Sequence, residues 1–352
     1  MPAVKAAANW QIATQSVRGA SHEQSGAPNQ DAVGAQLLTE ARGVVLAVAD
    51  GHGDDRHARS DRGSRFAVAA GIEVVAAWME QEATLAEADL RRSAQGLPAR
   101  IVQAWRAKVE ADVKADPPAD RHDLEGEGVE LLYGSTLVVA GIGGRFDVFL
   151  QVGDGDILSV APDGAVKRRA CGRTDLPSHL TESMCQADAV DRFRMEFVMR
   201  GRKGGSALVM LSSDGYANSF ADDAAFLKVG LDLKGLLEGR GLDHVADKLA
   251  QWLTETSHEG SGDDISLALA WDASPRENRR RKRMLLARAG LSLVLLAILI
   301  PLVTWAYFPS AWNNLKPAKW PQVLASLVEK IQGRQGAGDA VQAAPEDLPP
   351  LP

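Results

Sequence analysis

The chain has 352 residues, of which 45% are hydrophobic and 24% charged, and its formal net charge is −7. This composition is typical of a globular protein with one large domain and appendages, or with two modest domains. Residues 1–275 alone carry −13, which argues against nucleic-acid binding as the main task. Two cysteines, Cys171 and Cys185, are too few for a disulfide framework and lack zinc-site spacing, so we expect reduced thiols in or near the core.

The N-terminal part of the chain predicts three strands and one polar loop. Loose alternation over Asn9–Arg18 suits a strand, and residues 19–32 are rich in turn formers, which is typical of a loop. Further strands are expected at Ala32–Leu38 and Gly43–Ala49. The last of these is a continuous apolar run, which predicts a strand buried on both faces.

Two helices are expected next. Between residues 60 and 80, apolar residues recur every four positions without a proline, which predicts a helix packed against a core. These residues are Phe66, Ala70, Val74 and Trp78. A second helix is expected at Ala99–Lys114, and the proline pair at 117–118 ends it.

Strands predominate in the second half. They are expected at Leu131–Ala140, Phe146–Val152, Ile157–Ala161, Ala165–Arg169, Ala207–Ser213 and Ile265–Trp271. The third and fourth are joined by Pro-Asp-Gly, a hairpin turn. A surface loop is expected at Gly172–Val190, and helices at Ala221–Val229 and Leu242–Glu255. Because strands and helices come in separate blocks, we expect an α+β fold of mostly antiparallel sheets covered by helices.

The C-terminal part predicts a membrane anchor. Residues 289–308 hold no charge and, as a helix, would be about 30 Å long, the thickness of a bilayer core. The preceding basic linker, 276–288, holds seven Lys or Arg and one Glu. By the positive-inside rule we expect a single-pass protein of the inner or plasma membrane, with residues 1–288 cytoplasmic and a short, partly disordered tail, 309–352, outside. The alternative, a buried core helix, is disfavoured by the flanking cations.

Five aspartates share one kind of position, the edge of an apolar strand beside glycine or small polar residues. They are Asp31, Asp50, Asp154, Asp214 and Asp263. Clustered carboxylates repel one another unless a cation holds them, and oxygen ligands select Mg²⁺ or Mn²⁺. Two such ions would activate a water for attack on phosphorus. The alternatives are an ordinary Asp-Gly turn at position 50 and structural calcium sites, although no EF-hand spacing is present.

Six short motifs follow in order between Trp10 and Trp271: Asn-Gln-Asp, Asp-Gly-His-Gly, Gly-Ser-Thr, Val-Gly-Asp, Ser-Asp-Gly and Asp-Asp-Ile-Ser. In this order they resemble the PPM/PP2C family of metal-dependent protein Ser/Thr phosphatases, of bacterial type. The resemblance implies that residues 1–275 form a four-layer α-β-β-α sandwich, with two antiparallel sheets packed together and helices outside. It also implies a binuclear metal site at one end.

The resemblance implies a role for each aspartate. Asp50 would bridge two Mn²⁺ or Mg²⁺ ions, and the carbonyl of Gly51 would be a ligand of one of them. Asp214 and Asp263 would hold the other ion. Asp31 would be a ligand or hold metal-bound water.

Four further positions follow from the same resemblance. Asp154 matches the place of a weaker third ion. His52 matches a proposed general acid, and an ordinary histidine pKa of about 6.5 suits proton donation to a leaving oxygen. The alternative is a structural histidine. The family often has an arginine that grips the substrate phosphate where this chain has Gly26, so Arg18 or His22 is expected to supply that contact.

We therefore expect a membrane-anchored, cytoplasm-facing phosphatase of phosphoserine and phosphothreonine proteins that are substrates of a Ser/Thr kinase. Hydroxide bridging two Mn²⁺ or Mg²⁺ ions would attack phosphorus in line, without a phosphoenzyme. One alternative is a degenerate, non-catalytic phosphatase fold that binds phosphoproteins and signals through the membrane helix. Another is a dedicated phosphatase of one phosphoserine partner switch. The intact aspartates argue against the non-catalytic alternative, since a binding site would not need such mutually repelling groups.

Overall fold

The computed structural model describes residues 9–39, 43–82, 84–118, 128–170, 182–200 and 205–274. Within these residues, ten strands form two five-stranded sheets in which every neighbouring pair is antiparallel. The expected α+β fold with antiparallel sheets is thus confirmed. The basic linker, the expected membrane helix and the tail lie outside the described residues, as does Cys171.

The first sheet joins the two ends of the described chain. Its first strand pairs with its last over eight residues, from Trp10 opposite Asp272 to Val17 opposite Ile265. The strand order is β1-β10-β9-β6-β7. These strands are β1 (Trp10–Val17), β6 (Asp156–Val160), β7 (Val166–Arg168), β9 (Leu208–Ser212) and β10 (Ile265–Asp272).

The second sheet contains the continuous apolar run, strand β3, as its second strand. Every residue of β3 is buried, as are those of β4 and β5, which confirms a strand covered on both faces. The strand order is β2-β3-β4-β5-β8. These strands are β2 (Ala32–Leu37), β3 (Gly43–Ala49), β4 (Leu137–Gly143), β5 (Phe146–Val152) and β8 (Arg194–Met199).

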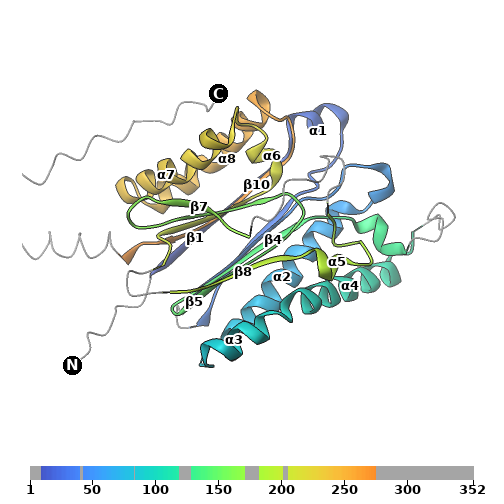
Figure 1. Cartoon of the computed structure of the whole chain (residues 1–352). Helices are drawn as coiled ribbons and strands as arrows, with labels where there is room; N and C mark the ends of the chain where they lie inside the picture. The colour runs from blue at the N-terminus through green and yellow to red at the C-terminus, as the bar shows by residue number, and fades with distance from the viewer. Residues whose placement is uncertain are drawn as a thin grey trace, which may run out of the picture. The chain divides into compact units, whose positions relative to one another are not determined.

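Side-chain alternation along β3 divides the core into layers. Val45 and Ala47 pack into a cluster with residues of α2 and α4, whereas Val44 and Leu46 pack into a cluster with β9 and β10 of the other sheet. A third cluster joins the outer face of the first sheet to α7 and α8. Successive side chains point to opposite faces of a strand, so one apolar run serves two cores. Figure 1 shows the result, with α7 and α8 over one sheet and α2, α3 and α4 over the other.

The longer helices confirm the periodicity read from the sequence. Ala70, Val74 and Trp78 are buried in α2, and Phe66 packs against the same cluster. The last two of these helices end later than the sequence predicts. Helix α7 continues to Gly239, and α8 continues to Glu259, beside Gly260. The helices of at least eight residues are α2 (Ser60–Glu82), α3 (Glu87–Ala94), α4 (Leu97–Ala115), α7 (Asp223–Gly239) and α8 (Leu242–Glu259).

Four local expectations were wrong or incomplete. The loop at 19–32 contains a helix, α1 (Ala20–Ser25), and the strand expected from Leu131 begins only at Leu137. Before it, residues 129–133 form a 3₁₀ turn, η4 (Val129–Tyr133), because the carbonyls of Leu131 and Leu132 accept hydrogen bonds from His57 and Arg59 and are not available to a sheet. Both α3 and β8 were missed. The other short elements are η2 (Asp55–His57), α5 (Ala189–Arg192) and α6 (Asp214–Ala217).

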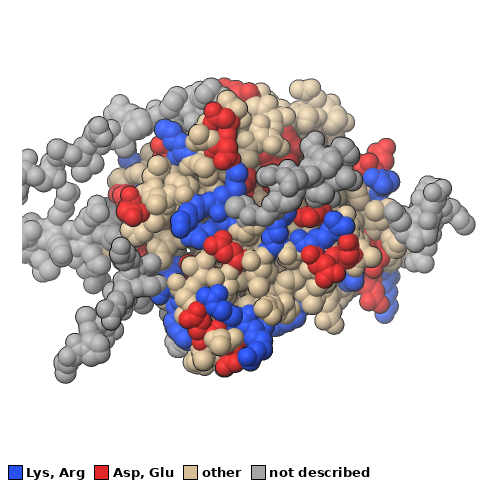
Figure 2. All heavy atoms as spheres, in the orientation of Figure 1, with Lys and Arg blue, Asp and Glu red and all other residues tan. Residues whose placement is uncertain are grey.

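An ion pair joins the edges of the two sheets, where Arg169, just beyond β7, pairs with Glu196 of β8 at 2.8 Å. Arg194 of β8 also pairs with Glu182 of the segment before it, at 3.1 Å. On the face shown in Figure 2, basic and acidic side chains are intermingled.

Among the described residues, no helix has both the length and the apolar character needed to span a bilayer.

Candidate metal centre

Strand register gathers the predicted aspartates at one end of the two sheets. Ala32 lies opposite Ala49, so Asp31 and Asp50, the residues just beyond that pair, emerge together. In the other sheet, Ser212 lies opposite Leu267, which brings Asp214 and Asp263 to the same end. Residues from widely separated motifs therefore converge.

The backbone around Asp50 is fixed by the strand beside it. The amide of Asp50 donates to Thr136 Oγ1 at 3.0 Å, and the amide of Thr136 donates to the Asp50 carbonyl at 2.8 Å. A Cβ atom at Gly51 would lie 2.7 Å from the carbonyl oxygen of Gln30 and 2.8 Å from that of Ser60. Only glycine fits there, so position 51 exposes its backbone rather than a side chain.

Hydrogen bonds hold two of the aspartates in place. Ser213 Oγ, just beyond β9, donates to Asp31 Oδ2 of the other sheet's end at 2.7 Å, and Asn218 Nδ2, at the C-terminal cap of α6, donates to Asp214 Oδ2 at 3.0 Å. The charges of Asp50 and Asp214 also repel each other, because both carboxyl groups are buried close together.

The cluster is electrostatically unfavourable when all its members are ionised. Burial raises the pKa of Asp31 to about 8, with Asp264 and Asp214 adding repulsion and the Ser213 hydrogen bond opposing the rise. Burial, then Asp154, raises the pKa of Asp214 to about 6. The pKa of Asp50 lies well above its ordinary value, because of burial and then the charges of Asp31 and Asp214.

These residues fit a hard divalent cation in donor chemistry. Asp31 Oδ1 and Asp214 Oδ1 are buried and have no hydrogen-bond partner among the residues that the structure describes. Buried carboxylate oxygens without partners are costly unless a cation or proton satisfies them, and oxygen donors favour Mg²⁺ or Mn²⁺. In the described part of the chain, no three His, Cys, Asp or Glu side chains form a ready-made metal shell. The structure therefore shows the donors gathered but not their arrangement around an ion.

The aspartates border a cavity of about 360 Å³. Its described lining comprises Ser21, His22, Gln30, Asp50, Gly51, His52, Gly53, Thr136, Asp154, Asp214, Ser261 and Asp263. Seven of the nine predicted site residues are in this lining. The other two are Asp31, which is buried beneath it, and Arg18, which is not among the described residues that line it.

His52 lies in the cavity wall, but its environment differs from the sequence expectation. Burial, and then the neighbouring His57, lowers the pKa of His52 to about 4, against a smaller opposing effect of Asp54. The two imidazole centroids are 4.9 Å apart, and His57 Nδ1 lies 2.5 Å from the carbonyl oxygen of Leu131. The ordinary histidine pKa that favoured a general acid is thus not retained, and the ring is neutral at pH 7.

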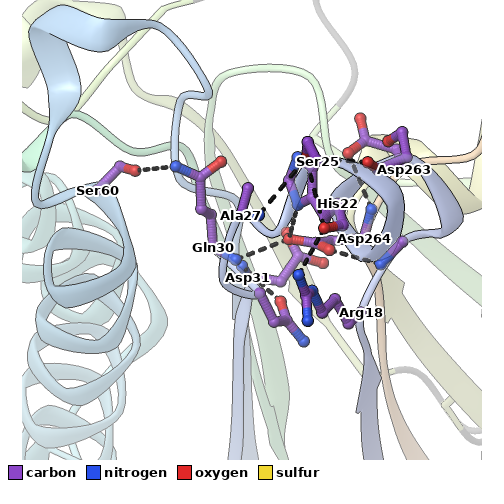
Figure 3. A network of polar contacts seen from close by, with 12 residues as sticks. Arg18, His22, Ser25, Ala27, Gln30, Asp31, Ser60, Asp263 and Asp264 are labelled. Atoms are coloured by element: carbon purple, nitrogen blue, oxygen red, sulfur yellow. Dashed lines mark hydrogen bonds and ion pairs between the residues drawn. The ribbon is translucent and has the colours of Figure 1, made fainter.

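The contacts of Arg18, His22 and Asp264 are drawn in Figure 3. Arg18 Nη2 donates to the carbonyl oxygen of His22 at 2.5 Å, so its guanidinium group supports the backbone of α1. His22 Nδ1 lies 3.0 Å from Asp264 Oδ2. The sequence singled out Asp264 only as part of a motif and did not foresee this pairing, because the two residues are 242 positions apart.

Asp154 lies in the cavity wall, and Asp156 begins strand β6 two residues later. Asp156 is paired with Arg168 at 2.6 Å, and burial raises its pKa to about 6 against the opposing charge of Arg168. Thr136 and Ser213, which hold Asp50 and Asp31, were not predicted as site residues. Their positions in the Gly-Ser-Thr and Ser-Asp-Gly motifs were the available signal.

Comparisons with known proteins place the sequence in one family. The family model described as Protein phosphatase 2C matches residues 18–254. A solved bacterial serine phosphatase is 16% identical, with 75% of this chain and 98% of that one covered and a TM-score of 0.50. The *Mycobacterium tuberculosis* serine/threonine phosphatase PstP/Ppp is 19% identical, with 74% and 98% covered and a TM-score of 0.45.

A third solved structure is the catalytic domain of the serine/threonine protein phosphatase PstP in complex with two manganese ions. It is 21% identical to this chain, with 74% of this chain and 97% of that one covered and a TM-score of 0.43. No curated protein matches the sequence.

Proposed function

The chain belongs to the protein phosphatase 2C family, and we propose that it hydrolyses phosphoserine and phosphothreonine in proteins with the help of Mn²⁺ or Mg²⁺. The observation that carries this proposal is the buried aspartate cluster at the cavity, with its unpartnered oxygens. A cluster of carboxyl groups that raise one another's pKa lowers stability, and this cost is expected where function needs it.

The metal-holding residues in this proposal are those expected from the sequence. Asp50 and the Gly51 carbonyl would hold one ion, Asp50 would also reach the second, and Asp214 and Asp263 would complete the second. Asp31 would be a further ligand or hold water, and its hydrogen bond from Ser213 fixes one carboxylate oxygen. The two manganese ions of the PstP catalytic domain support two positions.

A third, weaker ion would lie at Asp154. Bound in this cluster, such ions supply charge neutralisation for the phosphoryl oxygens and a nucleophile at neutral pH.

His52 would act on the leaving group. His52 reaches the cavity wall beside Gly51 and Gly53. As a neutral imidazole it keeps one N–H, which we propose donates a hydrogen bond to the departing serine or threonine oxygen.

The test is release of inorganic phosphate from a phosphothreonine peptide by the purified full chain with Mn²⁺. We expect many equivalents of phosphate per protein molecule. Tight binding of the peptide without release would instead favour a non-catalytic module that recognises phosphoproteins.

We further propose that residues 289–308 anchor the protein as a single-pass helix, with the phosphatase domain in the cytoplasm. The uncharged segment and the seven cations in the preceding linker support this proposal. The substrates would then be phosphoproteins at or near the inner face of the membrane.

A further inference from the structure

The cavity presents many negative groups and few positive ones. Its described lining includes four aspartates, and no Lys or Arg is among those residues. A phosphate monoester is itself an anion and needs donors besides any cation. In that lining, His22 and His52 are the only side chains that can carry a positive charge.

The environment of His22 differs from that of His52. The imidazole of His22 is 18% exposed, and its Nδ1 lies 3.0 Å from Oδ2 of Asp264, whose side chain is only 3% exposed. This contact is not aligned as a hydrogen bond, but it places the Nδ1 side of the ring against the carboxylate. Since Asp264 occupies Nδ1, Nε2 is the ring nitrogen that remains for a ligand.

Hydrogen bonds hold the backbone of the segment that carries His22. Besides the ring, Asp264 accepts the backbone amides of Gly19 at 2.6 Å and Gln30 at 2.7 Å. Just before His22, the amide and hydroxyl of Ser21 both donate to the carbonyl oxygen of Gly262, at 2.9 and 2.7 Å. One buried carboxylate therefore fixes both ends of the segment that carries His22, as Figure 3 shows.

We propose that His22 binds a phosphate oxygen of the substrate through Nε2, and that Asp264 is its positioning residue. This inference rests on the proposed phosphatase function. In the imidazolium form both ring nitrogens carry a proton, so the Nδ1 side faces the carboxylate of Asp264 and Nε2 donates to the phosphate. Because the ring is already held, little conformational freedom is lost when the substrate binds. Arg18, the other expected phosphate contact, serves the same segment by holding the His22 carbonyl from outside the described cavity lining.

The test compares His22→Gln with the wild-type full chain in the presence of Mn²⁺. Loss of a hydrogen bond to a charged group predicts a rise of roughly 10- to 100-fold in the KM for a phosphothreonine peptide, with a smaller change in kcat. Calorimetry should show a similar rise in the Kd of inorganic phosphate. The Kd of Mn²⁺ should change by less than about 3-fold, because His22 is not proposed as a ligand.

The matched control is His258→Gln. His258 of α8 also contacts α1, the helix that carries His22, since its Nε2 lies 3.5 Å from Glu23. However, His258 is half-exposed and outside the described cavity lining. Its removal should leave KM and phosphate affinity unchanged. An equal effect of the two substitutions would overturn the assignment of His22 to the phosphate.

Asp264→Asn tests the positioning role. The substitution should raise KM in the wild-type background but add little in the His22→Gln background, because Asp264 acts on the substrate through His22. If the two effects on KM multiply fully, Asp264 acts on the loop alone and the positioning claim is wrong.

The outcomes separate this inference from the function on which it rests. Wild-type turnover together with unchanged KM and phosphate Kd in His22→Gln would overturn the inference and leave the phosphatase function intact. Absence of wild-type turnover would overturn the function. Even then, weaker phosphate binding by His22→Gln than by the wild type would support the phosphate site.

Discussion

Asp50, Asp31 and Asp214 show what single residues contribute to the site. Each lies beside the end of an apolar strand, and each has a pKa above the ordinary aspartate value of 3.8 because it is buried near other aspartates. The folded protein without metal therefore binds protons more tightly than the unfolded chain does. The pH dependence of the free energy of unfolding therefore reports the repulsion among these aspartates.

The first prediction concerns pH in the presence of EDTA. Since the pKa values of Asp31 and Asp214 are raised to about 8 and about 6, the unfolded state binds fewer protons than the folded state between roughly pH 4 and 8. The free energy of unfolding should therefore fall as pH rises through this window, by at least about 1 kcal/mol, or roughly 2–4 °C in Tm. Thermal melts from pH 5 to 9 measure it. Asp31→Asn should flatten the profile, and a wild-type Tm that rises with pH would contradict the account.

The second prediction concerns His52. If its N–H assists the leaving oxygen, His52→Gln should lower the rate on a phosphothreonine peptide by about 10²–10⁴-fold. A nitrophenyl phosphate has a leaving group that barely needs a proton, so it should lose much less. Steady-state rates on both substrates decide the matter. Equal losses would assign His52 a structural or phosphate-binding role instead.

At the scale of elements, sequence patterns predicted what local periodicity encodes and missed what distant contacts impose. The β3 run and the apolar stripe of α2 need only their own side chains to be recognised. Helix α1 has no such stripe: its first turn is held by Ser257 and Gly262, which lie far away in the sequence. Strand β8 did carry a signal, since its alternating Met195, Phe197 and Met199 pack against the second sheet's core, but that alternation was overlooked.

The third prediction concerns the contact of α2 with η4. A Cβ atom at Gly63 would overlap the carbonyl oxygen of Tyr133, and the Gly63 carbonyl accepts a hydrogen bond from Trp105 Nε1 at 3.0 Å. Gly63→Ala should lower the free energy of unfolding by at least about 2 kcal/mol, because backbone has to move. The control is Gly235→Ala in α7, where a Cβ meets nothing within 4 Å. It should stabilise by about 0.5–1 kcal/mol. Chemical denaturation measures both, and equal effects would refute the packing argument.

For the whole molecule, the order of motifs and the family that it resembles were enough to predict which acids meet, and the structure shows that antiparallel register brings those strand ends together. The sequence could not predict the finer electrostatics. The lowered pKa of His52 depends on its burial and then on the neighbouring His57, and the pairing of His22 with Asp264 joins residues from the two ends of the phosphatase domain's sequence. Such properties arise from packing and not from spacing along the chain.

The fourth prediction concerns membrane topology. Cations are concentrated before residue 289, and the charge bias sets the orientation of a single span. A reporter that is active only outside the cytoplasm should give signal when fused after Pro352 and none when fused after Ala273. The reverse pattern would place the phosphatase domain outside and overturn the proposed substrates.

The most direct test of the central claim is a Mn²⁺ titration of phosphate release from a phosphothreonine peptide, with wild type and Asp50→Asn side by side. Asp50→Asn removes a charge with little change of volume, so circular dichroism should show a folded protein. We predict that wild-type release rises with Mn²⁺ and stops in EDTA. Asp50→Asn should be slower by more than about 100-fold, since even an outer-shell partner of a metal ligand is worth 10- to 100-fold. Undiminished release in EDTA, or near-normal release by folded Asp50→Asn, would contradict the metal-dependent mechanism.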